Sequence, residues 1–301
     1  MSNSTPNVDP PKSLWGRLLS STPVVMTVVA TLLAGLSNSE MTRAQYQRAL
    51  AAQQQSKVGD QWGYFQAKKE RSALLLGNLD LLFSTAEVRP IDGETPARLA
   101  VPGARVSTAA TEAIIHGKLP PFESQPITEP HIRAAMAALA GGRPDKEVSR
   151  ALAGVKGEDL DDAVETAQKN SRGFDETVSP ITHELDAWQK GLHGQSDKDK
   201  ADQRSFTAAR LRLEAARYEA EATFNSTLAQ LRELQVAFSN AVAERHHIRS
   251  QWFFFGMLGA QLAVMLASFG MALQRRNLFW GVAATIGLAA MAFGVYVYIY
   301  I

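Results

Sequence analysis

Histidine and carboxylate side chains are the groups in this chain that could bind a metal ion or transfer a proton. His246 and His247 are adjacent, so on a helix they point from different faces and cannot ligate one metal without a helper such as Glu244. The remaining histidines are scattered, and none has a second histidine four residues away: His116, His131, His183 and His193. We therefore expect no metal site, and we interpret His246 and His247 as part of a polar collar beside a membrane.

Motifs of nucleotide binding and nucleophilic catalysis are missing from the sequence. It contains no Gly-x-Gly-x-x-Gly, no P-loop and no Gly-x-Ser-x-Gly. It also lacks cysteine, which excludes disulfides, thiolate metal sites and a cysteine nucleophile. A formal net charge of +1 gives no electrostatic case for binding nucleic acid. We expect no catalytic residues, no cofactor and no nucleic-acid partner; an enzyme with a site in the middle of the chain is the weakest alternative.

Three apolar runs are long enough to cross a bilayer and therefore decide where the other residues lie. The first ends at Leu36 and has 22 residues when counted from Trp15, the second has 22 residues without a charge, and the third has 24. At 1.5 Å per residue, 22 helical residues span about 33 Å, enough for a hydrocarbon core of about 30 Å. A signal peptide or an interfacial helix is an alternative for the first run. We predict a disordered tail at 1–13 and transmembrane helices at 14–36, 252–273 and 278–301.

The polar residues between the first two runs are predicted to form two long helical arms, at 37–88 and 201–250. Both arms carry apolar side chains at helical spacing, without proline. In the first arm a seven-residue repeat places these side chains on one face: Val58, Trp62, Phe65, Leu76, Leu79 and Phe83. In the second arm they form a stripe: Leu213, Ala216, Ala220, Phe224, Leu228, Leu231, Leu234, Phe238 and Ala241. We favour an antiparallel hairpin of the two arms within one chain, because both ends must return to one bilayer face. A parallel coiled coil between subunits is the alternative.

The middle of the chain divides into a proline-rich loop and a small helical cap. Seven prolines between Arg89 and Pro130 exclude a long helix there, so we predict a loop at 89–130 with one short helix near Thr108–His116. The cap and its linker occupy 131–200. Gln195–Arg204 is charged and polar, which is typical of a solvated turn or linker. The cap helices are predicted at His131–Ala140, Asp145–Val155, Leu160–Lys169 and Asp175–Gly191. The predicted fold class is therefore an all-α integral membrane protein with three transmembrane helices, helical arms and a cap.

One segment of the first arm resembles a known family. The stretch Asp60-Gln61-Trp62-Gly63-Tyr64-Phe65-Gln66-Ala67-Lys68 is similar to the signature of the domain of unknown function 4337 family, which comprises bacterial membrane proteins. The layout of the chain is similar too, with an N-terminal hydrophobic helix, a polar helical middle and a C-terminal hydrophobic pair. The family name carries no activity, so the resemblance implies an architecture and no reaction.

Small and aromatic residues in the apolar runs predict how the spans pack and where they meet the bilayer surface. Small residues four apart allow close helix packing in membranes, within one chain or between subunits; they are Gly259, Ala263, Ala267, Ala30 and Ala34. Gln261, near mid-span, is predicted to form an interhelical hydrogen bond. Aromatic and cationic residues at the ends of the runs are predicted to lie at the membrane interface: Trp15, Arg17, Arg249, Trp252, Arg275, Arg276, Trp280, Tyr296 and Tyr298.

The placement of charged residues predicts how the protein is oriented across the membrane. Short loops with arginine remain in the cytoplasm, so the Arg275–Arg276 turn and the N-terminus are predicted to be cytoplasmic, with arms and cap in the periplasm of a bacterial inner membrane. Four arginines on the other side oppose this orientation: Arg43, Arg48, Arg245 and Arg249. We expect a non-enzymatic, homo-oligomeric scaffold or accessory protein that displays the cap away from the bilayer, with lipid and another membrane or periplasmic protein as partners. The alternative is a channel lined by the first span and the base of the first arm, Gln53, Gln54 and Gln55.

Overall fold

The computed structural model describes residues 14–91, 93, 95, 106–191, 197–272 and 276–301. Every regular element within these ranges is an α-helix, so the predicted all-α class is confirmed. The predicted tail at 1–13 and the predicted interface residue Arg275 lie outside the described residues. Three of the described helices are long and apolar enough to cross a membrane. The helices are α1 (Leu14–Thr85), α3 (Thr108–His116), α4 (Pro130–Ala140), α5 (Asp145–Leu152), α6 (Gly157–Gly191), α7 (Asp197–Ala272) and α8 (Arg276–Tyr300).

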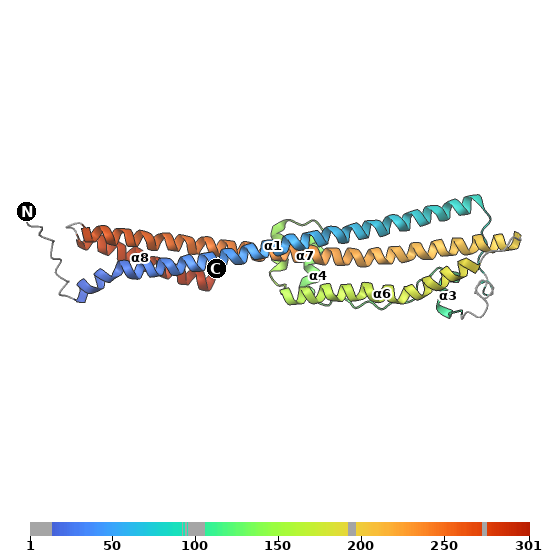
Figure 1. The fold of residues 1–301 in the computed structure, drawn as a ribbon, viewed down its shortest axis with the longest axis horizontal. Coiled ribbons are helices and arrows are strands. Elements are labelled where there is room, and N and C mark those ends of the chain that lie inside the picture. Colours follow the sequence, from blue (N-terminus) through green and yellow to red (C-terminus); the bar gives the residue numbers. More distant parts are fainter. Residues whose placement is uncertain (1–13, 92, 94, 96–105, 192–196, 273–275) are drawn as a thin grey trace, which may run out of the picture. The chain divides into compact units, whose positions relative to one another are not determined.

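The chain divides into two compact units. Unit 1 comprises Met1–Leu50 and Ser239–Ile301, and unit 2 comprises Ala51–Phe238. The helices α1 and α7 contribute residues to both units, α8 belongs to unit 1, and the helices from α3 to α6 belong to unit 2 (Figure 1). Each unit is described separately below.

Unit 1 is a bundle of α1, α7 and α8 with small residues in its interior. Ala30, Ala260 and Ala290, one from each helix, form a buried cluster. Glycines of α8 admit larger side chains of α1: a Cβ added at Gly294 would lie 2.7 Å from Leu33 Cδ2, and one at Gly287 would overlap a methionine of α1. Small side chains let helix backbones approach closely where the hydrophobic effect does not drive packing.

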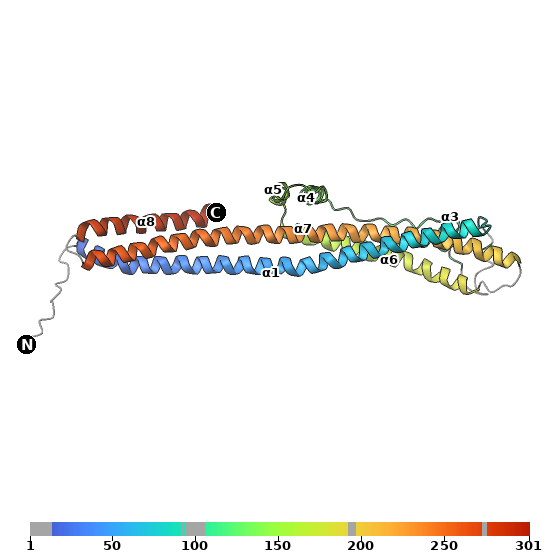
Figure 2. The ribbon, with the colours of Figure 1, turned by 90° about the horizontal axis from the view of Figure 1, so that it is seen from above.

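Unit 2 has two apolar clusters, both of which use α7. In the first, Leu228, Leu231 and Leu234 of α7 pack against α4, α5 and the start of α6. In the second, Phe206 and Leu213 of α7 pack against α3 and the end of α6. Figure 2 views α4 and α5 nearly end-on, so they cross the direction of α6 and α7. The leucine stripe of α7 is thus covered by the cap helices.

The described helices agree with some predicted boundaries and correct others. The short helix α3 has the predicted bounds, with Ser107 as its N-cap and Gly117, at φ 63°, as its left-handed C-cap. The predicted break between Leu160–Lys169 and Asp175–Gly191 is wrong, because α6 is one helix of 35 residues. The predicted linker Gln195–Arg204 is also wrong from residue 197 onward, because α7 begins at Asp197.

The continuity of α6 has a packing explanation. Proline in a helix interior removes one backbone hydrogen bond and costs about 3 kcal/mol, and Pro180 lies inside α6. Val178 and Ile181, on either side of it, are buried at 2% and 6% exposure. Gly173 also lies inside α6, and Phe122 packs against it, since an added Cβ would lie 3.1 Å from the Phe122 ring. Burial of apolar side chains thus outweighs the local signals for a break.

Candidate functional site

The segment Asp60–Lys68 lies on α1 in unit 2, where its tryptophan bonds to an acidic residue of α7. Trp62 Nε1 donates a hydrogen bond to Glu233 Oε1 at 2.7 Å. The Trp62 ring also meets Phe65 edge to face, with centroids 5.4 Å apart. A hydrogen bond from an indole N–H to a charged carboxylate is stronger than one between neutral groups. Trp62 therefore fixes this part of α1 on α7.

Two turns further along α1, Lys68 reaches a buried carboxylate. Glu221 of α7 is 5% exposed. It accepts one bond from Lys68 and another from Arg217 Nε at 2.6 Å. Ser72 of α1 then donates to a backbone carbonyl of α7 at 3.0 Å. Because removing a charge from water is costly, a buried carboxylate requires partners of this kind.

A tyrosine ring joins the cations of this cluster. The Tyr218 ring of α7 has Lys68 Nζ at 5.1 Å from its centroid, and Arg71 and Arg217 each at 5.8 Å. Cations within about 6 Å of an aromatic face are attracted by the ring quadrupole. We call the set of Lys68, Arg71, Arg217, Tyr218 and Glu221 the charged seam.

A second carboxylate beside the charged seam has a perturbed acidity. The pKa of Asp175 on α6 is raised, first because neighbouring atoms desolvate its carboxylate and second because the Glu221 charge repels it; Arg217 and Lys68 oppose the shift. The charged seam therefore contains a paired carboxylate, Glu221, and lies next to a second one, Asp175, whose ionised form is disfavoured.

This arrangement specifies how two helices pair. The contacts run in opposite order along the two helices: residue 62 with 233, 68 with 221, and 72 with 215. A slip of one turn would break the Trp62 bond and leave the Glu221 charge buried without its lysine. Buried polar groups of this kind set the register of helix pairs, and we assign this role to the charged seam and Trp62.

The other residues of the Asp60–Lys68 segment face away from α7 or make no polar contact. Tyr64 is 57% exposed, and Asp60, Gln66 and Ala67 are also exposed. The Gln61 side-chain oxygen is buried without a hydrogen-bond partner among the described residues. The segment thus contacts α7 through Trp62 and Lys68.

Comparison with known proteins identifies this segment. Residues 15–107 match the model of a family described as a domain of unknown function, DUF4337. This N-terminal part of the chain is similar to the DUF4337 family. The resemblance predicted from Asp60–Lys68 is confirmed. No curated protein and no solved structure matches the chain.

The DUF4337 segment contains only one side of the charged seam. Trp62 and Lys68 lie within residues 15–107, whereas Glu221 and Glu233 lie outside them. Sequence reasoning selected Trp62 and Lys68 but missed both glutamates. Arg217 and Glu221 are four residues apart, a spacing typical of a helix surface pair, and no local pattern distinguishes this buried pair from an exposed one.

Unit 1 has a polar collar where the apolar runs of α1 and α7 end. His246 Nδ1 lies 2.6 Å from Glu40 Oε2, and Arg43 lies 3.3 Å from the other oxygen of Glu40. Ser250 Oγ donates to the Ser37 carbonyl at 2.8 Å. Among the described residues, no group of three or more histidine, cysteine or acidic side chains could hold a metal ion.

The predicted packing residues of the spans lie in the interior of unit 1. Ala263 and Ala267 are 0% exposed, and an added Cβ at Gly259 would lie 3.5 Å from Ala290 of α8. Ala30 is 7% exposed, while Ala34 is half-buried and lines a groove. The alanine and glycine line of α7 therefore contacts α8 of the same chain.

The predicted interface residues differ in their surroundings. Trp280 is 1% exposed and packs with Ala267 and Ala283, and its indole nitrogen has no partner among the described residues. Trp252 is 40% exposed and contacts an aromatic ring of α8. Tyr296 and Tyr298 are exposed and Arg249 is half-buried. The side chains of Trp15, Arg17 and Arg276 lie outside the described residues.

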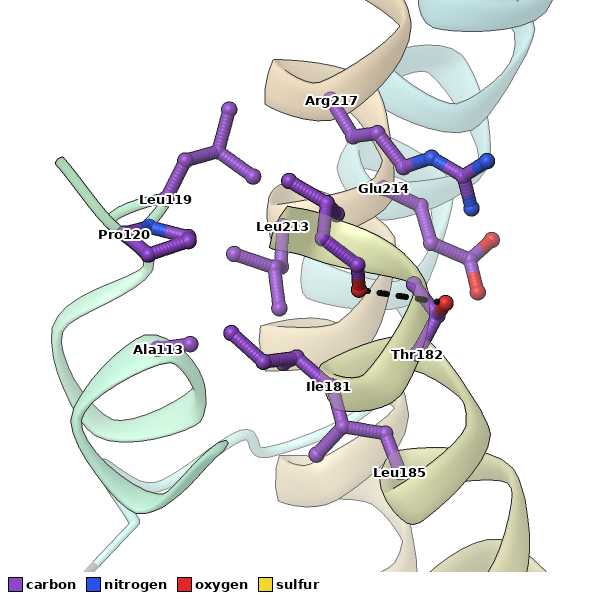
Figure 3. A pocket seen from close by; sticks show the side chains of 10 residues that line it. Ala113, Leu119, Pro120, Ile181, Thr182, Leu185, Leu213, Glu214 and Arg217 are labelled. Carbon is purple, nitrogen blue, oxygen red and sulfur yellow. Dashed lines mark hydrogen bonds between the residues drawn. The ribbon is translucent and has the colours of Figure 1, made fainter. Parts of the chain in front are cut away.

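Figure 3 shows a cavity in unit 2 enclosed by α3, α6, α7 and the segment after α3. Its volume is about 10 Å³, which corresponds to about one water molecule. Leu213 and Ile181 line it, while the charged ends of Glu214 and Arg217 lie opposite Leu119 and Pro120 (Figure 3). A gap of this size and lining is a packing defect too small for a substrate.

Proposed function

We propose that the protein is a non-enzymatic, homo-oligomeric membrane scaffold or accessory protein of the bacterial inner membrane. The observation that carries the membrane part is the distribution of side chains in unit 1. Its interior contains many alanines, whereas Leu32, Phe255, Met265 and Leu288 are 62%, 57%, 53% and 63% exposed. In water such a surface would be a severe aggregation hazard. In lipid it needs no further partner, because hydrocarbon solvates it.

The scaffold role rests on the charged seam. The most deeply buried charge in the seam, Glu221, is paired with Lys68 and Arg217, so its bonding capacity serves the contact between α1 and α7. We infer that α1 and α7 form an antiparallel hairpin of arms and that α3 to α6 form the displayed cap. A helix pair with a specified register is suited to presenting a surface.

We infer the orientation of the protein across the membrane from the placement of its arginines. We place the N-terminus and the Arg275–Arg276 turn in the cytoplasm, because short loops with arginine remain there. Unit 2 then lies in the periplasm. In protease treatment of intact spheroplasts, cleavage within unit 2 supports this orientation. Protection in intact spheroplasts with cleavage only after lysis contradicts it.

Two measurements test the function itself. We expect the full chain to stay in the membrane pellet after a carbonate wash, because three apolar helices hold it there. We expect the protein in lipid nanodiscs to have the mass of two or more chains by mass photometry. Release by carbonate contradicts the membrane role, and a monomeric mass in lipid contradicts the homo-oligomer.

A further inference from the structure

The surface of unit 1 contains a groove between α1 and α7 with polar side chains in it. The groove has a volume of about 510 Å³. It lies in the apolar part of both helices, where a lipid-facing surface is expected to be entirely hydrophobic. It is lined by Thr27, Ala30, Thr31, Ala34, Gln261, Val264 and Met265.

Gln261 is the residue that the bundle leaves unsatisfied. It is the tenth of the 22 residues in the apolar run 252–273 and is exposed on the surface of α7. Its side chain carries two N–H donors and one carbonyl acceptor, and it has no hydrogen-bond partner among the described residues. Hydrocarbon offers no partner either, so an amide at this depth favours contact with another protein surface.

The two threonines supply acceptors at the same level of the helix pair. Thr27 Oγ1 donates to the Pro23 carbonyl at 2.8 Å, and Thr31 Oγ1 donates to the Thr27 carbonyl at 2.9 Å. Each hydroxyl therefore has its donor occupied and can still accept a hydrogen bond, since no donor to it lies among the described residues. Thr31 follows Ala30 in the chain as Gln261 follows Ala260, and these two alanines share one buried cluster.

We propose that this groove is the contact site for a second copy of the chain, with Gln261 of each copy bonded across the interface. The proposal rests on the proposed function, since it requires unit 1 to lie in lipid and the protein to be a homo-oligomer. To the proposed homo-oligomer it adds which surface of the chain forms the contact between copies. The amide of Gln261 pairs either with the amide of the second copy or with the threonine oxygens in the partner groove.

A second copy fits better than an unrelated partner because the surface is self-complementary. An amide is both donor and acceptor, so two identical amides facing each other across a twofold axis satisfy one another. Gln261 and Met265 line the α7 side of the groove, with Met265 53% exposed, and Ala30 and Ala34 line its α1 side. A twofold axis at the groove brings the α7 side of each copy against the small residues of the other.

Substitution of the amide is the first test. In lipid nanodiscs or mild detergent, we expect Gln261→Leu to raise the dimer dissociation constant about tenfold, since each copy loses one interhelical hydrogen bond across the axis. Gln261→Asn retains an amide and is expected to retain most of the dimer. Thr285→Val is the matched control, because Thr285 is a back-bonded, exposed polar residue on α8, outside the groove.

Cross-linking is the second test and does not depend on the stability of the variant. The chain has no cysteine, so Met265→Cys introduces a single thiol beside the groove. Under mild oxidation in native membranes, we expect Met265→Cys to form a cross-linked dimer. The control Leu288→Cys, at a position 63% exposed on α8, is expected to remain monomeric on the denaturing gel.

The outcomes separate this interface from the proposed function. A wild-type oligomer that Gln261→Leu leaves unchanged, with no Met265→Cys dimer, overturns the interface but leaves the homo-oligomeric scaffold intact. A wild-type monomer in lipid overturns both. Cross-linking of Met265→Cys to a different protein overturns the second copy as the occupant.

Discussion

In unit 1, α7 buries alanines such as Ala260 and Ala263, whereas in unit 2 the same helix buries Leu231 and Leu234. The exposed positions of α7 also differ between the two units. Leu262 of α7 is 44% exposed in unit 1, while charged residues such as Arg212 and Glu219 are exposed in unit 2. Leucines of α7 thus lie inside unit 2, whereas leucines such as Leu262 lie on the surface of unit 1.

This contrast indicates that the two units are stabilised by different forces. In water, burial of large apolar side chains supplies about 25 cal/mol per Å² of apolar surface, so unit 2 gains most from a leucine-rich interior. In lipid that driving force is absent between helices, and close packing of small residues replaces it. Truncation should therefore damage unit 2, and enlargement should damage unit 1.

The largest effect is expected from truncating the unit 2 core. Leu231 is 0% exposed and belongs to the cluster between α7 and the cap helices. Leu231→Ala should lower the free energy of unfolding by about 2–5 kcal/mol, through lost burial and the cavity left behind. Urea unfolding of the full chain in detergent, followed by circular dichroism, measures this. The control Leu262→Ala, on the exposed surface of unit 1 that we propose faces lipid, should change little. Equal losses of stability in the two variants would contradict the difference between the units.

Enlargement of a small residue is the converse test in unit 1. Gly294→Leu should destabilise the bundle by about 1–3 kcal/mol, because a Cβ at this position already lies 2.7 Å from Leu33. Gly281→Leu on the same helix is the matched control, since nothing lies within 4 Å of an added Cβ there. Thermal aggregation of detergent-solubilised protein compares the two. Equal behaviour of both variants would show that α1 and α8 do not pack closely.

The charged seam gives a smaller effect that is specific to unit 2. Glu221→Gln removes a charge whose side chain is 6% exposed and leaves Lys68 and Arg217 without their carboxylate. We expect a loss of about 1–3 kcal/mol in the free energy of unfolding. Glu219→Gln breaks a pair with Lys69 in which both side chains are about half exposed, so its cost should stay below about 1 kcal/mol. A Glu219→Gln loss as large as that of Glu221→Gln would refute a special role for the buried carboxylate.

The smallest effect concerns pH. Asp175 has a raised pKa in the folded protein, so its ionisation opposes folding. This penalty is absent below the ordinary value of 3.8 and grows as pH rises through the raised pKa. Asp175→Asn should therefore be more stable than the wild type at pH 7, with no difference below pH 3.8.

Urea unfolding of the Asp175→Asn variant at both pH values measures the effect. In a Glu221→Gln background the gain should shrink, because the Glu221 charge is one cause of the raised pKa. A gain that is the same at both pH values would point to packing rather than charge.

Local patterns in the sequence determined the helical class, the three apolar runs and the bounds of α3. These features depend on residues close together in the chain: hydropathy over about 20 residues, helical spacing and capping residues such as Ser107 and Gly117. The family segment was recognisable for the same reason, since Trp62 and Lys68 lie within nine consecutive residues.

Tertiary structure alone decided which surface each side chain meets. The stripe of α7 was predicted to pack on the first arm, but Leu228 and Leu231 contact the cap. Trp280 lies inside the bundle of unit 1, where it packs with Ala267 and Ala283. The partners of Lys68 and Trp62 lie more than 150 residues away along the chain. Periodicity defines the apolar face of a helix, but the neighbour that covers this face depends on contacts between distant parts of the chain, which no local pattern encodes.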